Sequence, residues 1–256
     1  MIKKILSYNV NGLRAASNKG LFDWLRTENP DIICIQEIKL QKGQFDVKII
    51  ESLGYHHYWH YALKKGYSGV AIFSKDKPIE IIEGIGMPEY DNEGRFIMAK
   101  YEKFGLISTY FPSGTTGDIR QTFKMRWLDD FLTYVSKIRN SHDKIIISGD
   151  YNICHKPIDI NHPERHETYS GFLPEERAWM DKFVAQGFVD SFRIFNQNPD
   201  QYSWWSYRAG TREKNLGWRI DYHIVTESMK PMLKSASILN QAHHSDHCPV
   251  SVEIDV

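Results

Sequence analysis

An apolar run closes on a glycine, an acid and an amide in Lys144-Ile145-Ile146-Ile147-Ser148-Gly149-Asp150-Tyr151-Asn152. The isoleucines are typical of a buried strand, and Gly149 is expected to let the backbone turn and expose the acid. Side chains two positions apart on an extended segment point the same way. Asp150 and Asn152 should therefore converge just past the carboxyl end of the strand, where open α/β sheets bind ligands.

Similar endings recur elsewhere in the chain. Ile5–Gly12 ends in the amides Asn9 and Asn11, Ile32–Glu37 ends in a carboxylate, and Ser245-Asp246-His247 leads into an apolar alternation. A single acid after a strand is most often a turn former or a helix cap. Because four such endings occur in one chain, independent turn or cap roles do not explain the pattern well. Acids, amides and one imidazole, without a cysteine-rich cluster, favour a hard-cation site for phosphate chemistry.

The histidine has two interpretations. An isolated histidine is more often a satisfied core residue, but the neighbouring Asp246 and the strand that follows favour a functional His247. A carboxylate that orients an imidazole needs a position such as that of Asp221 or Asp246.

Composition narrows the class of protein without identifying it. The 256 residues hold 32 Lys plus Arg and 32 Asp plus Glu, so a polyanionic partner would need a local basic face. Three scattered cysteines predict free thiols in a reducing compartment. We find no stretch of about 18 apolar residues, and Met1 leads directly into a strand, which leaves no room for a signal peptide. We expect a soluble, cytoplasmic protein.

Short apolar strands alternate with amphipathic segments, and no linker interrupts them. We expect strands near 2–9, 31–37, 57–62, 69–75, 79–83, 95–102, 105–111, 144–150, 219–226 and 248–255. The spacing of Ile119, Phe123, Trp127 and Phe131 predicts one helix. A second helix should begin at Pro174 and end before Gly187. The pattern predicts one α/β domain over residues 1–256.

The order of these motifs resembles a known family over nearly the whole chain. The segments that carry the resemblance are Asn9-Val10-Asn11-Gly12-Leu13-Arg14-Ala15, Gln36-Glu37, Gly66–Ala71, Tyr110-Phe111-Pro112, Gly149–Asn152, Ser170–Trp179, Tyr202–Arg208, Trp218–Tyr222 and Ser245–His247. They are similar to the motifs of exonuclease III-type apurinic/apyrimidinic (AP) endonucleases, within the endonuclease/exonuclease/phosphatase superfamily. The resemblance implies a four-layer αββα sandwich, two mixed β-sheets flanked by helices.

The resemblance also implies a reaction: Mg²⁺-dependent cleavage of the DNA backbone 5′ to an abasic site, leaving a 3′-hydroxyl. 3′-Phosphodiesterase and 3′→5′ exonuclease activity can accompany it. Glu37, Asp246 and Asn11 would bind the Mg²⁺, for which Mn²⁺ can substitute. Some relatives carry Asp at the position of Asn11.

Resemblance assigns the catalytic roles to a second set of residues. Asp150 would activate the attacking water, held by Asn152 and Asn9. His247, oriented by Asp221, would contact the scissile phosphate. Tyr110 would donate to a phosphate oxygen or to the leaving oxygen.

The implied partner is double-stranded DNA with abasic sites, bound by a monomer. Trp204, Trp218 and Ile220 would line a pocket for the extruded sugar, although tryptophans are more commonly core residues. Arg208, Ser113, Lys65 and Arg177 would contact DNA, with Lys124 among further candidates for phosphate contacts. Ser113 stands where some relatives have an amide.

Two other classes of function compete with this one. An RNA nuclease or a phosphatase of phosphoinositides or sphingolipids would keep the site but lack the tryptophan pocket and the 172–179 segment. A nucleic-acid-binding module without catalysis would have lost one of the catalytic or metal-binding residues. The chain retains all of these features.

Overall fold

The computed structural model describes residues 1–208 and 210–256 and contains two six-stranded mixed sheets. The first sheet has the strand order β11-β12-β1-β2-β4-β3, and the second has the order β5-β6-β7-β8-β10-β9. The strands of the first sheet are β1 (Ile2–Asn9), β2 (Ile32–Gln36), β3 (His56–His60), β4 (Val70–Ser74), β11 (Leu233–Ile238) and β12 (Val250–Asp255). Those of the second sheet are β5 (Glu80–Glu83), β6 (Phe96–Lys100), β7 (Gly105–Tyr110), β8 (Ile145–Asp150), β9 (Phe188–Asp190) and β10 (Asp221–Thr226).

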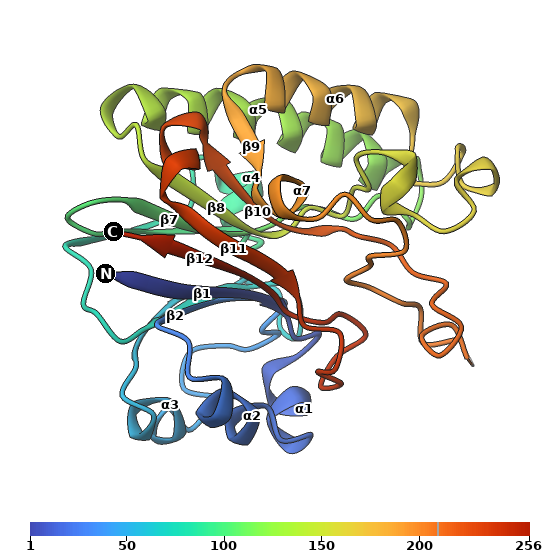
Figure 1. Cartoon of the computed structure of the whole chain (residues 1–256). Helices are drawn as coiled ribbons and strands as arrows, with labels where there is room; N and C mark the ends of the chain where they lie inside the picture. The colour runs from blue at the N-terminus through green and yellow to red at the C-terminus, as the bar shows by residue number, and fades with distance from the viewer. Residues whose placement is uncertain (209) are drawn as a thin grey trace.

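Helices cover the outer face of each sheet (Figure 1). On one side lie α1 (Leu13–Asn18), α2 (Leu21–Glu28) and α3 (Lys48–Ser52); on the other lie α5 (Asp118–Ser141) and α6 (Pro174–Ala185). The short helices α4 (Pro88–Asp91) and α7 (Ser191–Phe195) complete the α-helical set of the described residues. Three apolar clusters fill the spaces between these layers. The predicted four-layer αββα sandwich is confirmed.

Sheet register brings three polar side chains of the second sheet together. β7 runs parallel to β8, and this pairing sets Tyr110 opposite Asp150. β10 runs antiparallel to β8 on its other side and sets Asp221 opposite the same residue. Side chains that are directly opposite on neighbouring strands lie on the same face of a sheet. The register therefore makes Asp150 the centre of a row of three polar groups.

Gly149 serves a different purpose from the predicted turn. It lies inside β8, and a Cβ atom at this position would collide with the carbonyl oxygen of Thr109 on β7. The chain turns instead at Asn152, whose φ is 51°. The glycine permits close strand pairing, and the amide provides the left-handed residue that follows the strand.

Most predicted elements match the structure, but two of its strands, β9 and β11, have no counterpart in the prediction. The two predicted helices correspond to α5 and α6. Half of the residues of β11, Leu-Lys-Ser-Ala-Ser-Ile, are polar, and β9 is only three residues long; each strand lies at the edge of its sheet. An edge strand that is covered on one side needs little apolar surface, so it lacks the pattern that marks a buried strand. No helix of the described residues is long and apolar enough to cross a membrane.

Candidate active site

One buried amide joins the two sheets at the carboxyl ends of their strands. The Nδ2 of Asn9, at the end of β1, donates to Glu37 Oε1 at 2.9 Å and to Asp150 Oδ2 at 2.9 Å. Glu37 follows β2 in the same sheet as Asn9, whereas Asp150 ends β8 in the other sheet. The side chains that the sequence placed at separate strand ends therefore meet at one point between the sheets.

Asp150 is only 1% exposed and is held by amides on both oxygens. Its Oδ1 accepts from the backbone N–H of Asn152 at 2.8 Å, and its Oδ2 accepts from Asn9. Burial, reinforced by the charge of Asp221, raises the pKa of the Asp150 carboxyl to about 7. A carboxylate with a pKa near neutrality is suited to accept a proton.

His247 forms a buried ion pair behind this carboxylate. Its Nδ1 lies 2.9 Å from Asp221 Oδ2, which also accepts a hydrogen bond from Ser203 Oγ at 2.6 Å. Burial alone would lower the pKa of the imidazole, but the charge and hydrogen bond of Asp221 outweigh it and raise that pKa to about 10. The protonated ring presents Nε2 toward Asp150, 3.8 Å from Oδ2.

Glu37, Asp150 and His247 form a group whose potential ligand atoms lie within 4.8 Å of one another. A protonated imidazole has no lone pair to give a metal, so the carboxylates are the usable ligands of this group. Lys39 already places a cation beside them: its Nζ lies 2.9 Å from Glu37 Oε2 and also donates to Asn11 Oδ1. Burial opposes ionisation of Glu37, but the charge of Lys39 lowers the pKa of this carboxyl. Charge and oxygen ligands together fit a hard divalent cation.

Asp246 lies beside Asn11 at the edge of this group. It accepts from Asn11 Nδ2 at 3.0 Å and from the indole Nε1 of Trp204 at 3.0 Å, and Ser245 Oγ donates at 3.1 Å. A carboxylate has about four acceptor positions, so these three bonds leave room for one more partner. The indole bond also fixes the orientation of Trp204 relative to the charged groups.

Tyr110 lies near the same carboxylates, and its phenol group stays protonated. Burial, together with the charges of Glu37 and Asp150, holds the pKa of the phenol well above its usual value. Its ring lies against the guanidinium of Arg95, whose Cζ is 4.9 Å from the ring centroid. Tyr110 can therefore donate a hydrogen bond at neutral pH.

These groups open into a cleft of about 800 Å³. Trp204 and Trp218 form one wall, with their rings 5.8 Å apart and nearly perpendicular, and Ile220 lies beside them. Both tryptophans are partly exposed, so they line the cleft rather than fill the core. The other lining residues from the predicted set are Glu37, Tyr110, Ser113, Asp150, Asn152, Arg208, Asp246 and His247.

Three predicted DNA-contact residues lie elsewhere. Lys65 is exposed outside the cleft lining, and Arg177 lies with its guanidinium 4.4 Å from the ring centroid of Phe172. The expectation that Lys124 contacts phosphate is wrong, because its side chain is fully buried and bonded to Glu176. The apolar face of α5 carries this lysine inward, which residue type alone does not reveal.

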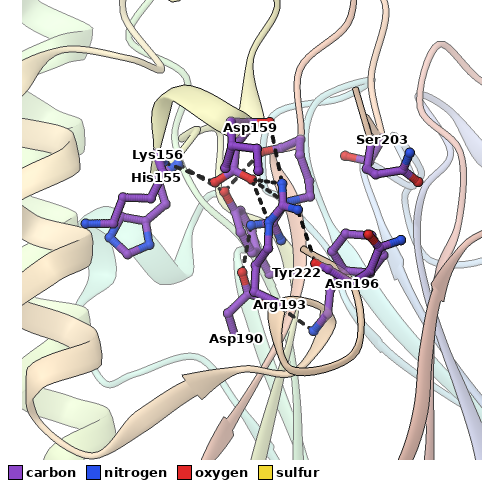
Figure 2. Close-up of polar contacts among 12 residues, drawn as sticks. His155, Lys156, Asp159, Asp190, Arg193, Asn196, Ser203 and Tyr222 are labelled. Carbon is purple, nitrogen blue, oxygen red and sulfur yellow. Dashed lines mark hydrogen bonds and ion pairs between the residues drawn. The ribbon is translucent and has the colours of Figure 1, made fainter. Parts of the chain in front are cut away.

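A second group of buried charges escaped the sequence analysis. Asp159 Oδ1 accepts from Arg219 Nε at 2.8 Å and from Arg193 at 2.6 Å, and Arg219 also donates to Asp190 at 2.7 Å. We call Asp159, Asp190, Arg193 and Arg219 the arginine cluster; Figure 2 shows Asp159, Arg193 and Asp190 gathered with Tyr222. Arg219 lies between Trp218 and Ile220 in the chain, so the cluster anchors the segment that forms the cleft wall. Asp159, the Asp190–Arg193 segment and Arg219 are far apart in sequence, and no local motif marks the cluster.

Comparisons with known proteins agree with this geometry. The model of the "Endonuclease/Exonuclease/phosphatase family" matches residues 6–247. An exodeoxyribonuclease of Bacillus subtilis is 44% identical, with 99% of this chain and 100% of that protein aligned. The structure of an AP endonuclease from Archaeoglobus fulgidus superposes with a TM-score of 0.91 at 30% identity, covering 99% of this chain and 100% of that one. A 3′ phosphatase from Neisseria, bound to a product DNA hairpin, superposes with a TM-score of 0.89 at 29% identity and the same coverage.

Proposed function

The chain belongs to the Endonuclease/Exonuclease/phosphatase family, and we propose that it is a Mg²⁺-dependent DNA-repair nuclease that cuts the backbone 5′ to abasic sites and leaves a 3′-hydroxyl. The main observation behind this proposal is that Glu37, Asp150 and protonated His247 lie close together at the base of a cleft lined by tryptophans. The relatives named exodeoxyribonuclease and AP endonuclease support the same reaction class.

In this proposal Glu37, Asp246 and Asn11 would hold the Mg²⁺, and Mn²⁺ could replace it. Mg²⁺ prefers oxygen ligands and needs only one or two carboxylates, which fits this sparse set. The bound ion supplies positive charge that offsets the negative charge of the phosphodiester. The contacts of Lys39 with Glu37 and Asn11 support the assignment, because they indicate that these oxygens favour a cation.

Asp150 acts as the base in this scheme. It takes a proton from a water molecule, whose oxygen then forms a bond to phosphorus. Its raised pKa, about 7, makes it able to accept that proton. Asn9 and Asn152, which already hold the carboxylate through their amides, keep it aimed at the water.

The other two groups act on the phosphate and the leaving oxygen. His247, kept cationic by Asp221, places positive charge next to the phosphate oxygens. The bond from phosphorus to the 3′ oxygen breaks, and Tyr110 donates to the departing oxygen. The products are a 3′-hydroxyl and a 5′ sugar phosphate.

The cleft walls select the lesion in this proposal. Trp204, Trp218 and Ile220 admit a bare deoxyribose and exclude a nucleotide that still carries its base, and an abasic nucleotide costs less to extrude. Further contacts to the duplex come from Arg208, Ser113, Lys65 and Arg177. The same site would act on 3′ ends as a phosphodiesterase or exonuclease; the Neisseria neighbour, named a 3′ phosphatase, also acts on a 3′ end. We further propose that the protein is a monomer and that it is cytoplasmic; its three buried free thiols suit a reducing compartment.

The proposal is tested with a labelled duplex that carries one synthetic abasic site, beside an undamaged control, in Mg²⁺ or in EDTA. We expect a single metal-dependent cut 5′ to the lesion, with shortening from 3′ ends reporting exonuclease activity. Glu37→Ala should raise the Mg²⁺ concentration needed for half-maximal cleavage. Failure to cut either duplex in Mg²⁺ or Mn²⁺ would overturn the proposal and direct the search to RNA or lipid phosphoesters.

A further inference from the structure

A fully buried ion pair lies under the floor of the cleft. Lys124, on α5, and Glu176, on α6, each have zero exposure, and Nζ lies 2.5 Å from Oε1. Removing two charges from water costs more than an apolar pair of the same volume, so stability alone does not account for such a pair. The groups that it contacts indicate what it does.

The lysine holds the backbone of a proposed catalytic residue. Lys124 Nζ donates to the carbonyl oxygen of Asn152 at 2.7 Å. Asn152 has a φ of 51°, a conformation that residues other than glycine adopt at a cost. Its side-chain Nδ2 donates to Phe111 O at 2.9 Å and lies 3.4 Å from Asp150 Oδ2. The ammonium therefore fixes the peptide that aims this amide at Asp150.

The glutamate holds the segment behind the tryptophan wall. Glu176 Oε2 accepts from the backbone N–H groups of Gly171 at 2.6 Å and Leu173 at 3.0 Å. Gly171 packs directly against the indole, since a Cβ atom there would lie 2.7 Å from Trp218 Cζ3 and 3.3 Å from Asn152 O. Displacing the Gly171 backbone would thus disturb both Trp218 and Asn152.

We propose that Lys124 and Glu176 are a positioning pair that locks the amide of Asn152 and the Trp218 wall into one arrangement, so that cleavage rate and lesion selectivity depend on the same contact. The inference rests on the proposed function for its substrate. Neither residue touches the cleft, and each acts through backbone groups that do.

The test compares wild type with Lys124→Met, Glu176→Gln and Lys124→Arg on abasic and undamaged duplexes. Misplacing a catalytic group by about 1 Å costs up to about 100-fold in rate. We expect Lys124→Met and Glu176→Gln each to lower kcat about 10- to 100-fold and to reduce the preference for abasic DNA. Lys124→Arg, which keeps the cation, should stay within a few-fold of wild type.

Val135→Ala is the matched control, because Val135 is buried on the same helix, in the core and outside the cleft lining. It should lower stability and leave kcat and selectivity unchanged. If Lys124→Met and Glu176→Gln retain wild-type kcat and selectivity, or change them no more than Val135→Ala does, the pair is structural and the inference fails. Glu176→Gln preserves volume and supplies the answer if Lys124→Met does not fold.

Hydrogen exchange separates this inference from the proposed function. The amides of Gly171 and Leu173 should be protected in wild type and lose protection selectively in Glu176→Gln. An inactive wild type would refute the proposed function and leave this readout usable. Unchanged protection of both amides in Glu176→Gln would overturn the positioning role, whatever the enzyme cleaves.

Discussion

Two groups of buried charged residues flank the start of β10, and they differ in the ratio of acidic to basic side chains. In the arginine cluster, two carboxylates contact two guanidinium groups. Burial raises the pKa of Asp159, but the charge of Arg219 outweighs this effect and lowers that pKa. In the catalytic cluster, which we define as Asp150, Asp221 and His247, two carboxylates share one imidazolium. At a similar degree of burial, the neighbouring charges therefore leave the pKa of Asp159 lowered and that of Asp150 raised.

The difference teaches what each cluster contributes. A buried carboxylate with its own cations remains charged and holds chain segments together, whereas one that shares a cation is left ready to take up a proton. Asp159 is thus structural and Asp150 is chemically poised. The predictions below test this contrast.

The largest effect is expected on the chemistry. Asp150→Asn removes the proposed base and should lower the cleavage rate by about 10²- to 10⁴-fold. DNA affinity should stay close to wild type, because the cleft walls are unchanged. Single-turnover cleavage and equilibrium binding to an abasic duplex measure the two quantities. Turnover within tenfold of wild type would remove Asp150 from the role of base.

The next largest effect is on stability. Asp159→Asn leaves buried guanidinium charge without its partner and should lower the free energy of unfolding by about 3–5 kcal/mol. Urea unfolding measures it. Asp181→Asn is the control, because that carboxylate pairs with Lys156 on the surface, and it should cost at most about 1 kcal/mol. Equal losses in the two variants would contradict the distinction between the clusters.

Trp218 directly precedes Arg219 of the arginine cluster in the chain, and its loss should affect recognition more than rate. Trp218→Ala opens the wall and should reduce the preference for abasic over intact duplex by about tenfold, since apolar pocket contacts discriminate at this level. Competition cleavage of the two duplexes measures it. Trp59→Ala, on β3 in the other sheet, should preserve the preference. Undiminished selectivity in Trp218→Ala would return this residue to a packing role.

The smallest effect is a pH dependence of opposite sign for the two acids. The folded pKa of Asp150 is raised to about 7, so its ionisation costs stability as pH rises from its unfolded pKa of about 4 to about 7. The stability of Asp150→Asn relative to wild type should therefore increase over this range. The folded pKa of Asp159 is lowered, so its contribution is present above pH of about 4 and disappears as pH falls through the folded value.

Urea titrations at a series of pH values would measure both trends. A flat difference between Asp150→Asn and wild type from pH 4 to 7 would contradict the raised pKa. A penalty of Asp159→Asn that does not change as the pH falls below about 4 would contradict the lowered one.

Sequence patterns predicted the parts of the molecule that have local signatures. Apolar runs ending in Asn9, Glu37 and Asp150 predicted both the strands and their convergence, because strand periodicity fixes where those side chains point. The family resemblance added the cleft walls at Trp204 and Trp218. The individual catalytic roles remain predictions.

Buried charges could not be predicted in the same way. Lys124 resembles any surface lysine of a helix, and its burial depends on Glu176, 52 residues away in sequence. Asp159 and Arg219 are 60 residues apart. The energy of such pairs is decided by tertiary packing, which a single sequence pattern does not encode.

The bridge from Asn9 to Glu37 and Asp150 has a consequence for how the protein matures. One end of that bridge belongs to each sheet, so a folding intermediate with a single sheet formed contains only half of the centre. Contacts between residues far apart in sequence form slowly compared with local structure, and Asn9 and Asp150 are 141 residues apart. The bridge is thus complete only when both sheets are in place, and a chain with one sheet formed lacks it.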